Sequence, residues 1–139
     1  MSKDINTTEY SEYQPRFTVD NSEIIFTRKV NGQEDLFSAK KQDSSYVVEP
    51  ISAINTRYNE GAQTISGDGN YLIFTHCNDK AGFGSCDLYE SIKVNGQWSR
   101  PKNVGTPINS SGWESQPSLN EDGSVLYFAS NYANGLGQS

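Results

Sequence analysis

Two cysteines and a single histidine are the residues of this chain whose types could do redox or metal chemistry. Cys77 and Cys86 stand nine positions apart, and His76 directly precedes the first of them. If the intervening residues form a hairpin, the cysteines occupy near-opposite positions on paired strands, close enough for a disulfide. A reduced pair is the second interpretation. The third is a zinc site completed by Asp79 or Asp87, which the lone histidine and the lack of a Cys-x-x-Cys motif disfavour.

Three glutamates recur at equivalent places in the chain and could form a set of carboxylates around an axis. Glu12, Glu60 and Glu114 each come just before a predicted first strand, where they could bind a cation or a basic peptide. The favoured alternative is that each carboxylate accepts hydrogen bonds from the neighbouring connecting segment. Under the first interpretation these glutamates form a partner-binding rim together with their neighbours Arg57, Tyr58 and Trp113. An aromatic residue at such a rim could stack on a sugar, anchor a protein or simply cover an edge.

The chain offers little for catalysis. It has no nucleophile with a neighbouring base, no glycine-rich phosphate loop and no Gly-x-Ser-x-Gly elbow. The adjacent acids Glu121 and Asp122 lie in a predicted turn rather than across a cleft, as a glycosidase requires. The Asp-Gly turns are too short for calcium loops, whose oxygen ligands alternate over about a dozen residues. We therefore predict a non-enzymatic protein with no cofactor and no metal.

These residues belong to a pattern that occurs three times. The segment 113–128, Trp-Glu-Ser-Gln-Pro-Ser-Leu-Asn-Glu-Asp-Gly-Ser-Val-Leu-Tyr-Phe, can be laid over residues 60–74 and 12–26. The equivalent glutamates are 48 and 54 positions apart, a period typical of repeat architectures. Because Ile-Asn-(Thr/Ser) opens each copy, we divide this single domain into repeats at residues 5–53, 54–107 and 108–139, the last one incomplete.

Each copy predicts a strand, a turn and a second strand. Solid apolar runs at 24–26, 72–74 and 126–128 are typical of strands covered on both faces. The turns before them are Asp20-Asn21, Asp68-Gly69 and Asp122-Gly123, in which Asn or Gly can take positive φ and Asp can bond nearby amides. Asn31-Gly32 and Asn95-Gly96 predict two further hairpins. The predicted strands are residues 14–19, 23–29, 35–40 and 46–49, then 62–66, 71–76, 87–94 and 97–99.

Four antiparallel strands per unit of roughly 50 residues form the blade of a β-propeller. We predict an all-β fold with two complete blades and part of a third, because residues 135–139 align with the segment that leads into the third strand of the middle copy. A partial ring leaves open strand edges, so we expect self-association. A monodisperse folded monomer would count against it.

Composition excludes some classes of partner. The chain has 139 residues, 12% of them aromatic, and a net charge of −6. Nucleic-acid binding needs a basic surface, so we do not expect it. No apolar run approaches the roughly 18 residues that span a membrane, and the first residues do not resemble a signal peptide.

The repeat resembles a known family. Glu114-Ser-Gln-Pro-Ser-Leu-Asn-Glu-Asp-Gly-Ser-Val-Leu-Tyr-Phe-Ala-Ser is similar to the WD40-like PD40 repeat of TolB-type propellers. The linker 98–109 resembles the inter-blade segment of this repeat in envelope proteins of Bacteroidetes. Residues 59–66, 73–78 and 84–89 are similar to the propeller of proteins that end in an OmpA-like peptidoglycan-binding domain, such as the peptidoglycan-associated component of the type IX secretion system. The sequence departs from the pattern at Asn21, where Gly is usual, and at Ala62-Gln63, where the other copies have Gln-Pro.

The resemblance implies a periplasmic scaffold whose partners are envelope proteins, with peptidoglycan reached through a separate domain. In an oxidising periplasm Cys77 and Cys86 are expected to form a disulfide, which adds about 2 to 3 kcal/mol by the chain-entropy estimate. The alternative function is a carbohydrate-binding or carbohydrate-hydrolysing propeller whose site lies mostly outside this stretch.

Overall fold

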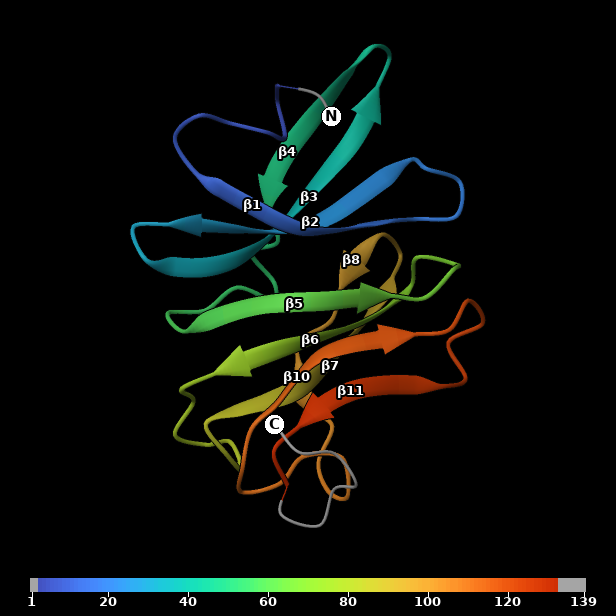
Figure 1. The fold of residues 1–139 in the computed structure, drawn as a ribbon. Coiled ribbons are helices and arrows are strands. Elements are labelled where there is room, and N and C mark those ends of the chain that lie inside the picture. The colour runs from blue at the N-terminus through green and yellow to red at the C-terminus, as the bar shows by residue number, and fades with distance from the viewer. Residues whose placement is uncertain (1–2, 133–139) are drawn as a thin grey trace.

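The structure, a computed structural model, describes residues 3–132, and among them there are strands, turns and loops but no helix. No helix in this part of the chain is therefore available to cross a membrane. Three antiparallel sheets follow one another from the N-terminal end to the C-terminal end (Figure 1). We call them blade 1, blade 2 and blade 3. Their first strands lie one below the other along the same side of the molecule (Figure 1).

Blade 1 is a four-stranded meander within the first predicted repeat. Its strands pair in the order of the sequence and are β1 (Ser11–Phe17), β2 (Glu23–Val30), β3 (Gln33–Gln42) and β4 (Ser45–Pro50). The Asn31-Gly32 turn between β2 and β3 has positive φ at both residues, as predicted. β1 begins three residues before the predicted strand, because a bulge at Gln14 interrupts the regular pattern in the sequence.

Blade 2 has the same order but a broken outer strand. It consists of β5 (Asn59–Ile65), β6 (Tyr71–Cys77), β7 (Cys86–Val94), β8 (Gln97–Trp98) and β9 (Lys102–Asn103). Both β8 and β9 pair with β7, so they share the place of a fourth strand. The prediction of one strand at 97–99 was therefore wrong in extent. Pro101 lies in the break, where a residue without an N–H cannot continue the ladder.

Blade 3 is described only as the pair β10 (Glu114–Leu119) and β11 (Leu126–Ser130). Residues 135–139, which we aligned with the segment before a third strand, lie outside the described residues. The described blades do not close a ring.

The turn between the first two strands is built alike in all three blades. Asp20, Asp68 and Asp122 each accept a hydrogen bond from the backbone N–H two residues later. The pKa of each of these exposed carboxyls is lowered by hydrogen bonds within the turn. Asn21, Gly69 and Gly123 have positive φ. The predicted Asp-Gly and Asp-Asn turns are confirmed.

Apolar packing joins blade 1 to blade 2. The shared core is a cluster of Ile25, Leu36, Ile51, Ile54, Leu72 and Phe74. The runs 24–26 and 72–74 are buried as predicted. The run 126–128 is not, since Tyr127 is 67% exposed. β11 pairs only with β10 among the described residues, so the expected cover on both faces is missing there.

An ion pair between the buried Glu23 and the partly buried Lys93 also joins blades 1 and 2. Lys93 Nζ lies 2.7 Å from Glu23 Oε2, and Ser38 donates a second hydrogen bond to the same carboxylate. Burial by itself raises the pKa of Glu23, but the hydrogen bonds from Lys93 and Ser38 outweigh it and hold the pKa below its ordinary value. The ionised form of Glu23 therefore stabilises the folded state.

Acid should weaken this contact between the blades. Because the folded pKa of Glu23 is lowered, its contribution is fully present above the ordinary glutamate value and is lost as the pH falls through the folded value. We expect Glu23→Gln to reduce the loss of stability between pH 5 and pH 3, measured by urea unfolding. Glu9→Gln, at an exposed position, is the control. Identical acid profiles for wild type and Glu23→Gln would contradict the prediction.

Candidate partner-binding site

The three repeated glutamates lie at the starts of the first strands, but they turn inward. Each carboxylate accepts hydrogen bonds from both the backbone N–H and the hydroxyl of a Thr or Ser in the preceding connector, the pairs being Glu12 with Thr7, Glu60 with Thr56 and Glu114 with Ser110. Glu60 and Glu114 are completely buried. Their carboxylates therefore hold the connectors in place, as in the favoured alternative, and do not face solvent.

Each glutamate also meets a donor on the second strand of its blade. The donor is Arg28 Nε at 2.9 Å in blade 1, His76 Nδ1 at 3.0 Å in blade 2 and Ser130 Oγ at 2.9 Å in blade 3. A permanent cation, a titratable ring and a neutral hydroxyl thus occupy one structural position. We call the connector hydroxyl, the glutamate and this donor the clasp of each blade.

Cys77 and Cys86 are joined by a disulfide, which confirms that prediction. They stand directly opposite each other on β6 and β7, with their Cα atoms 4.0 Å apart. The bond excludes their use as zinc thiolates. Among the described residues no group of three or more His, Cys, Asp and Glu is arranged to hold a metal ion.

His76 is enclosed by the clasp of blade 2 rather than available to a ligand. It is buried, its ring packs against Tyr58 and Tyr89, and its Nε2 lies 3.6 Å from Asp79 Oδ2. Burial raises the pKa of the Tyr89 hydroxyl, and the nearby carboxylate of Asp79 raises it further. The two ring nitrogens of His76 thus lie near the carboxylates of Glu60 and Asp79, and its ring contacts the two tyrosines.

The remaining residues of the predicted rim lie on connectors. The guanidinium of Arg57 stacks over the ring of Tyr58 at 5.0 Å and donates a hydrogen bond to its hydroxyl. The Trp113 backbone N–H donates a hydrogen bond to Asn131 Oδ1. The backbone of Trp113 also forms an isolated parallel β-bridge with that of Cys86. A partner-binding role of Arg57, Tyr58 and Trp113 stays a prediction.

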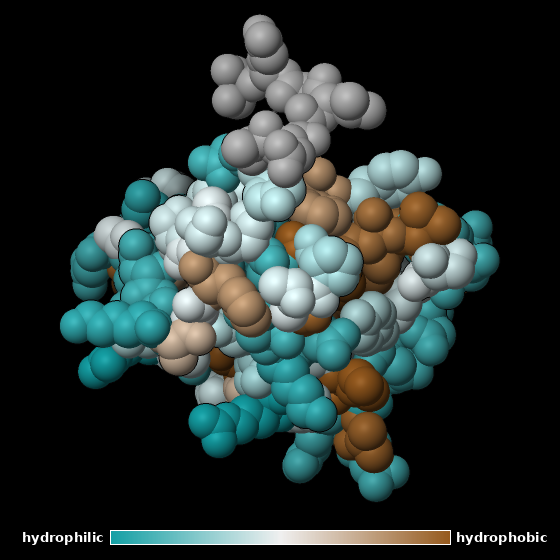
Figure 2. Space-filling model, turned by 90° about the horizontal axis from the view of Figure 1, so that it is seen from below, coloured by the Kyte–Doolittle hydropathy of each residue, from teal (hydrophilic) through white to brown (hydrophobic). Residues whose placement is uncertain are grey.

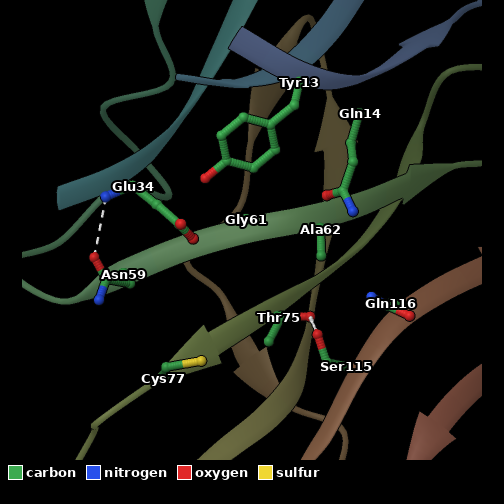
Figure 3. Close-up of a pocket in the computed structure, with 10 residues that line it drawn as sticks. All are labelled: Tyr13, Gln14, Glu34, Asn59, Gly61, Ala62, Thr75, Cys77, Ser115 and Gln116. Atoms are coloured by element: carbon green, nitrogen blue, oxygen red, sulfur yellow. Dashed lines mark hydrogen bonds between the residues drawn. The ribbon is translucent and has the colours of Figure 1, made fainter. Parts of the chain in front are cut away.

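A feature that the sequence did not predict is a bulge repeated in the first strand of every blade. The strand register shifts at Gln14, Ala62 and Gln116, and these residues have φ of 54°, 46° and 54°. Such a residue is not paired in the ladder, and the strand bends there. All three lie around one cavity, between the first strands (Figure 3).

This cavity has a volume of about 170 Å³ and walls of mixed polar and apolar character. Ten residues from all three blades line it, and every one is labelled in Figure 3. Tyr13 and Glu34 enter from blade 1 with their side chains pointing toward each other (Figure 3). Gly61 forms part of the wall at the place where blades 1 and 3 have Tyr13 and Ser115. Because Gly61 has no side chain, Thr27 and Glu34 can both lie close against it.

Electrostatics in the cavity are dominated by Glu34. Burial raises the pKa of the Tyr13 hydroxyl, and the neighbouring Glu34 carboxylate raises that pKa further, so Tyr13 stays neutral. A Cβ added to Gly61 would lie 3.3 Å from Glu34 Oε2. The carboxylate therefore sits directly over the bulge of β5. Sequence reasoning missed Glu34 because it lies on β3, far from the repeated motif.

Comparison with known proteins supports the fold. No family model matches the chain, and no curated protein matches it. Among solved structures, the crystal structure of TolB from Acinetobacter baumannii matches with a TM-score of 0.65 and 16% sequence identity, over 94% of this chain. The chain has a TolB-like β-propeller fold. It spans 29% of the length of that TolB chain.

The cavity lies between the first strands β1, β5 and β10, and we call this side of the blades the channel side. The repeated Gln-Pro of the first and third copies was the signal in the sequence that could have located it, because Gln14 and Gln116 are the bulged residues.

Proposed function

We propose that this chain is a non-enzymatic protein-interaction module and that it binds its partner on the channel side of the propeller. The observation that carries this proposal is the cavity to which all three blades contribute polar side chains. The clasps and the inter-blade contacts supply a rigid frame for it, since a site on paired strands is held more firmly than one on loops. The TolB-like fold supports the proposal only at the level of architecture.

We infer in addition that the module belongs to the periplasm, within a larger protein of the PD40 and OmpA-like kind. The disulfide supports an oxidising compartment, where such bonds persist. The link to peptidoglycan or to secretion rests on the sequence resemblance alone.

Binding assays separate this function from the carbohydrate alternative. The immobilised full chain is exposed to a solubilised envelope fraction of a Bacteroidetes bacterium, and separately to soluble glycans and peptidoglycan fragments. We expect a saturable complex with a protein that can be identified, purified and bound again, and no glycan binding. Binding of a glycan that Trp113→Ala abolishes would support the carbohydrate alternative and contradict the scaffold.

We also propose that the open end of blade 3 associates with blade 1 of a second copy. Tyr127 holds the place that Ile25 and Ile73 hold in the other blades, where both are buried. Figure 2, seen from the blade 3 end, shows hydrophobic residues gathered on this face. On blade 1, Phe17 is 49% exposed although its counterpart Ile65 packs between the blades. A second copy would thus repeat the contact already made between blades 1 and 2.

Solution mass tests this association. Light scattering is expected to give a discrete oligomer that Tyr127→Ser dissociates, because the substitution removes the most exposed aromatic side chain of β11. The exposed Tyr132 gives a matched control, Tyr132→Ser. A wild-type monomer with a cooperative melt would contradict the proposal.

A further inference from the structure

The channel-side cavity presents one carboxylate among neutral polar groups. Glu34 supplies the carboxylate, and Gln14 and Gln116 lie on opposite sides of the cavity with side-chain amides whose oxygens can accept hydrogen bonds (Figure 3). Tyr13 is a hydroxyl donor that points toward Glu34 (Figure 3). A ligand that pairs with the Glu34 carboxylate must therefore bring donors.

One of these acceptors lacks a partner. Gln14 Oε1 is buried and accepts no hydrogen bond within the described part of the chain. A buried acceptor without a donor costs about 1 to 3 kcal/mol, so a donor group in the cavity would relieve that cost.

Charge points in the same direction. None of the residues that line the cavity is Lys, Arg or His, and Glu34 is the one charged side chain among them. The whole chain carries a net charge of −6, which attracts cationic ligands. A donor-only cation, an ammonium or a guanidinium group, satisfies both the carboxylate and the amide oxygens.

The size of the cavity limits what enters. At about 170 Å³ it is smaller than the roughly 300 to 1,000 Å³ of small-molecule pockets. It suits the end of one long side chain rather than a sugar chain or a whole metabolite. Its opening lies beside the unpaired edges of the first strands, along which an extended peptide can run.

We propose that this cavity receives a lysine or arginine side chain of an extended peptide segment, with Glu34 as its counter-ion. The inference rests on the proposed interaction function, and names the chemistry that the partner must present. Gln14 and Gln116 accept hydrogen bonds from the same cationic group, since both line the cavity with Glu34. The three buried glutamates play no part in it.

Short blocked peptides test this inference. They carry one central arginine, lysine or norleucine, and a fourth has norleucine with a free N-terminus, so that a chain terminus is distinguished from a side chain. Binding is followed by NMR shifts of the backbone amides of Gly61, Ala62 and Gln116. We expect the arginine and lysine peptides to bind, more weakly as salt is added, and the norleucine peptides not to bind.

Two variants of the cavity sharpen the test. Glu34→Gln keeps the shape and removes the charge, and should weaken binding about 10-fold or more. Ala62→Gln fills the space, at a bulge conformation that glutamine already adopts at positions 14 and 116. It should also weaken binding. Glu121→Gln changes the net charge equally at an exposed turn and should leave the affinity unchanged.

Several results would overturn the inference: equal binding of the norleucine peptide, binding only through the free N-terminus, unchanged affinity in Glu34→Gln, or no binding by folded wild type. The proposed function fails separately. If an identified protein partner binds wild type and Glu34→Gln equally, the proposed interaction function stands, and the inference that the cavity receives a cationic side chain is wrong. If neither peptide nor protein binds, both are wrong.

Discussion

Replacing Glu60 by leucine is expected to lower the free energy of unfolding by about 3 to 5 kcal/mol, because several buried donors lose their acceptor and each one costs about 1 to 3 kcal/mol. Glu60 is fully buried and accepts hydrogen bonds from the amide and hydroxyl of Thr56 and from His76 Nδ1. Leucine cannot accept any of them. The Thr56 amide and His76 Nδ1 would stay buried without the acceptor that they have in the wild type. Urea unfolding measures the change.

A double-mutant cycle tests whether the effect comes from the clasp of blade 2. His76→Phe in the Glu60→Leu background removes the orphaned ring nitrogens, so the double variant should lose less than the sum of the two single variants. Glu121→Leu, at an exposed turn, should change stability by no more than about 0.5 kcal/mol. Additive losses in the cycle, or a loss below about 1 kcal/mol for Glu60→Leu, would contradict this account of the clasp.

Gln63→Leu is expected to cost about 3 kcal/mol, because it breaks a hydrogen-bonded link between blades 1 and 2 and leaves several buried groups unpaired. The Gln63 amide nitrogen donates to the carbonyl oxygens of Gln14 at 2.6 Å and Ile25 at 3.0 Å, and its oxygen accepts from Thr27 Oγ1 at 2.8 Å. All three partners belong to blade 1. The residue itself is 1% exposed, so water does not replace the lost bonds.

Urea unfolding and amide hydrogen exchange together locate this effect. Faster exchange in β1 and β2 is expected to accompany the loss of stability, since these strands carry the partners of Gln63. Gln97→Leu, at an exposed strand end, serves as the control and should be near neutral. Unchanged exchange in blade 1 would show that Gln63 does not hold the two blades together.

Local chemistry in the chain was sufficient to predict most of the fold. The Asp20, Asp68 and Asp122 turns form as expected because each needs only a side-chain oxygen and an amide two residues away. The Asn31-Gly32 hairpin likewise depends on residues next to one another. The disulfide also follows from a local contact, because the pairing of β6 with β7 places Cys77 directly opposite Cys86.

The errors at the starts of the first strands have one physical cause. A left-handed residue at Gln14 or Ala62 breaks the alternation of the first strand, so only the part after the bulge has a recognisable pattern. The residues before the bulge, among them Glu60, were therefore placed outside the strand. In the structure they pair with the second strand and turn their side chains inward.

The sequence alone determined the repeat and the blade, because each depends on neighbours in the chain or on a constant spacing. The tertiary structure decided between the three interpretations of the cysteines, and it decided which carboxylate lines the cavity. Glu60 is turned inward by its own connector, whereas Glu34 reaches the cavity because the packing of blade 1 on blade 2 brings β3 over the bulge of β5. No local sequence pattern predicts this packing, since it joins residues from separate repeats.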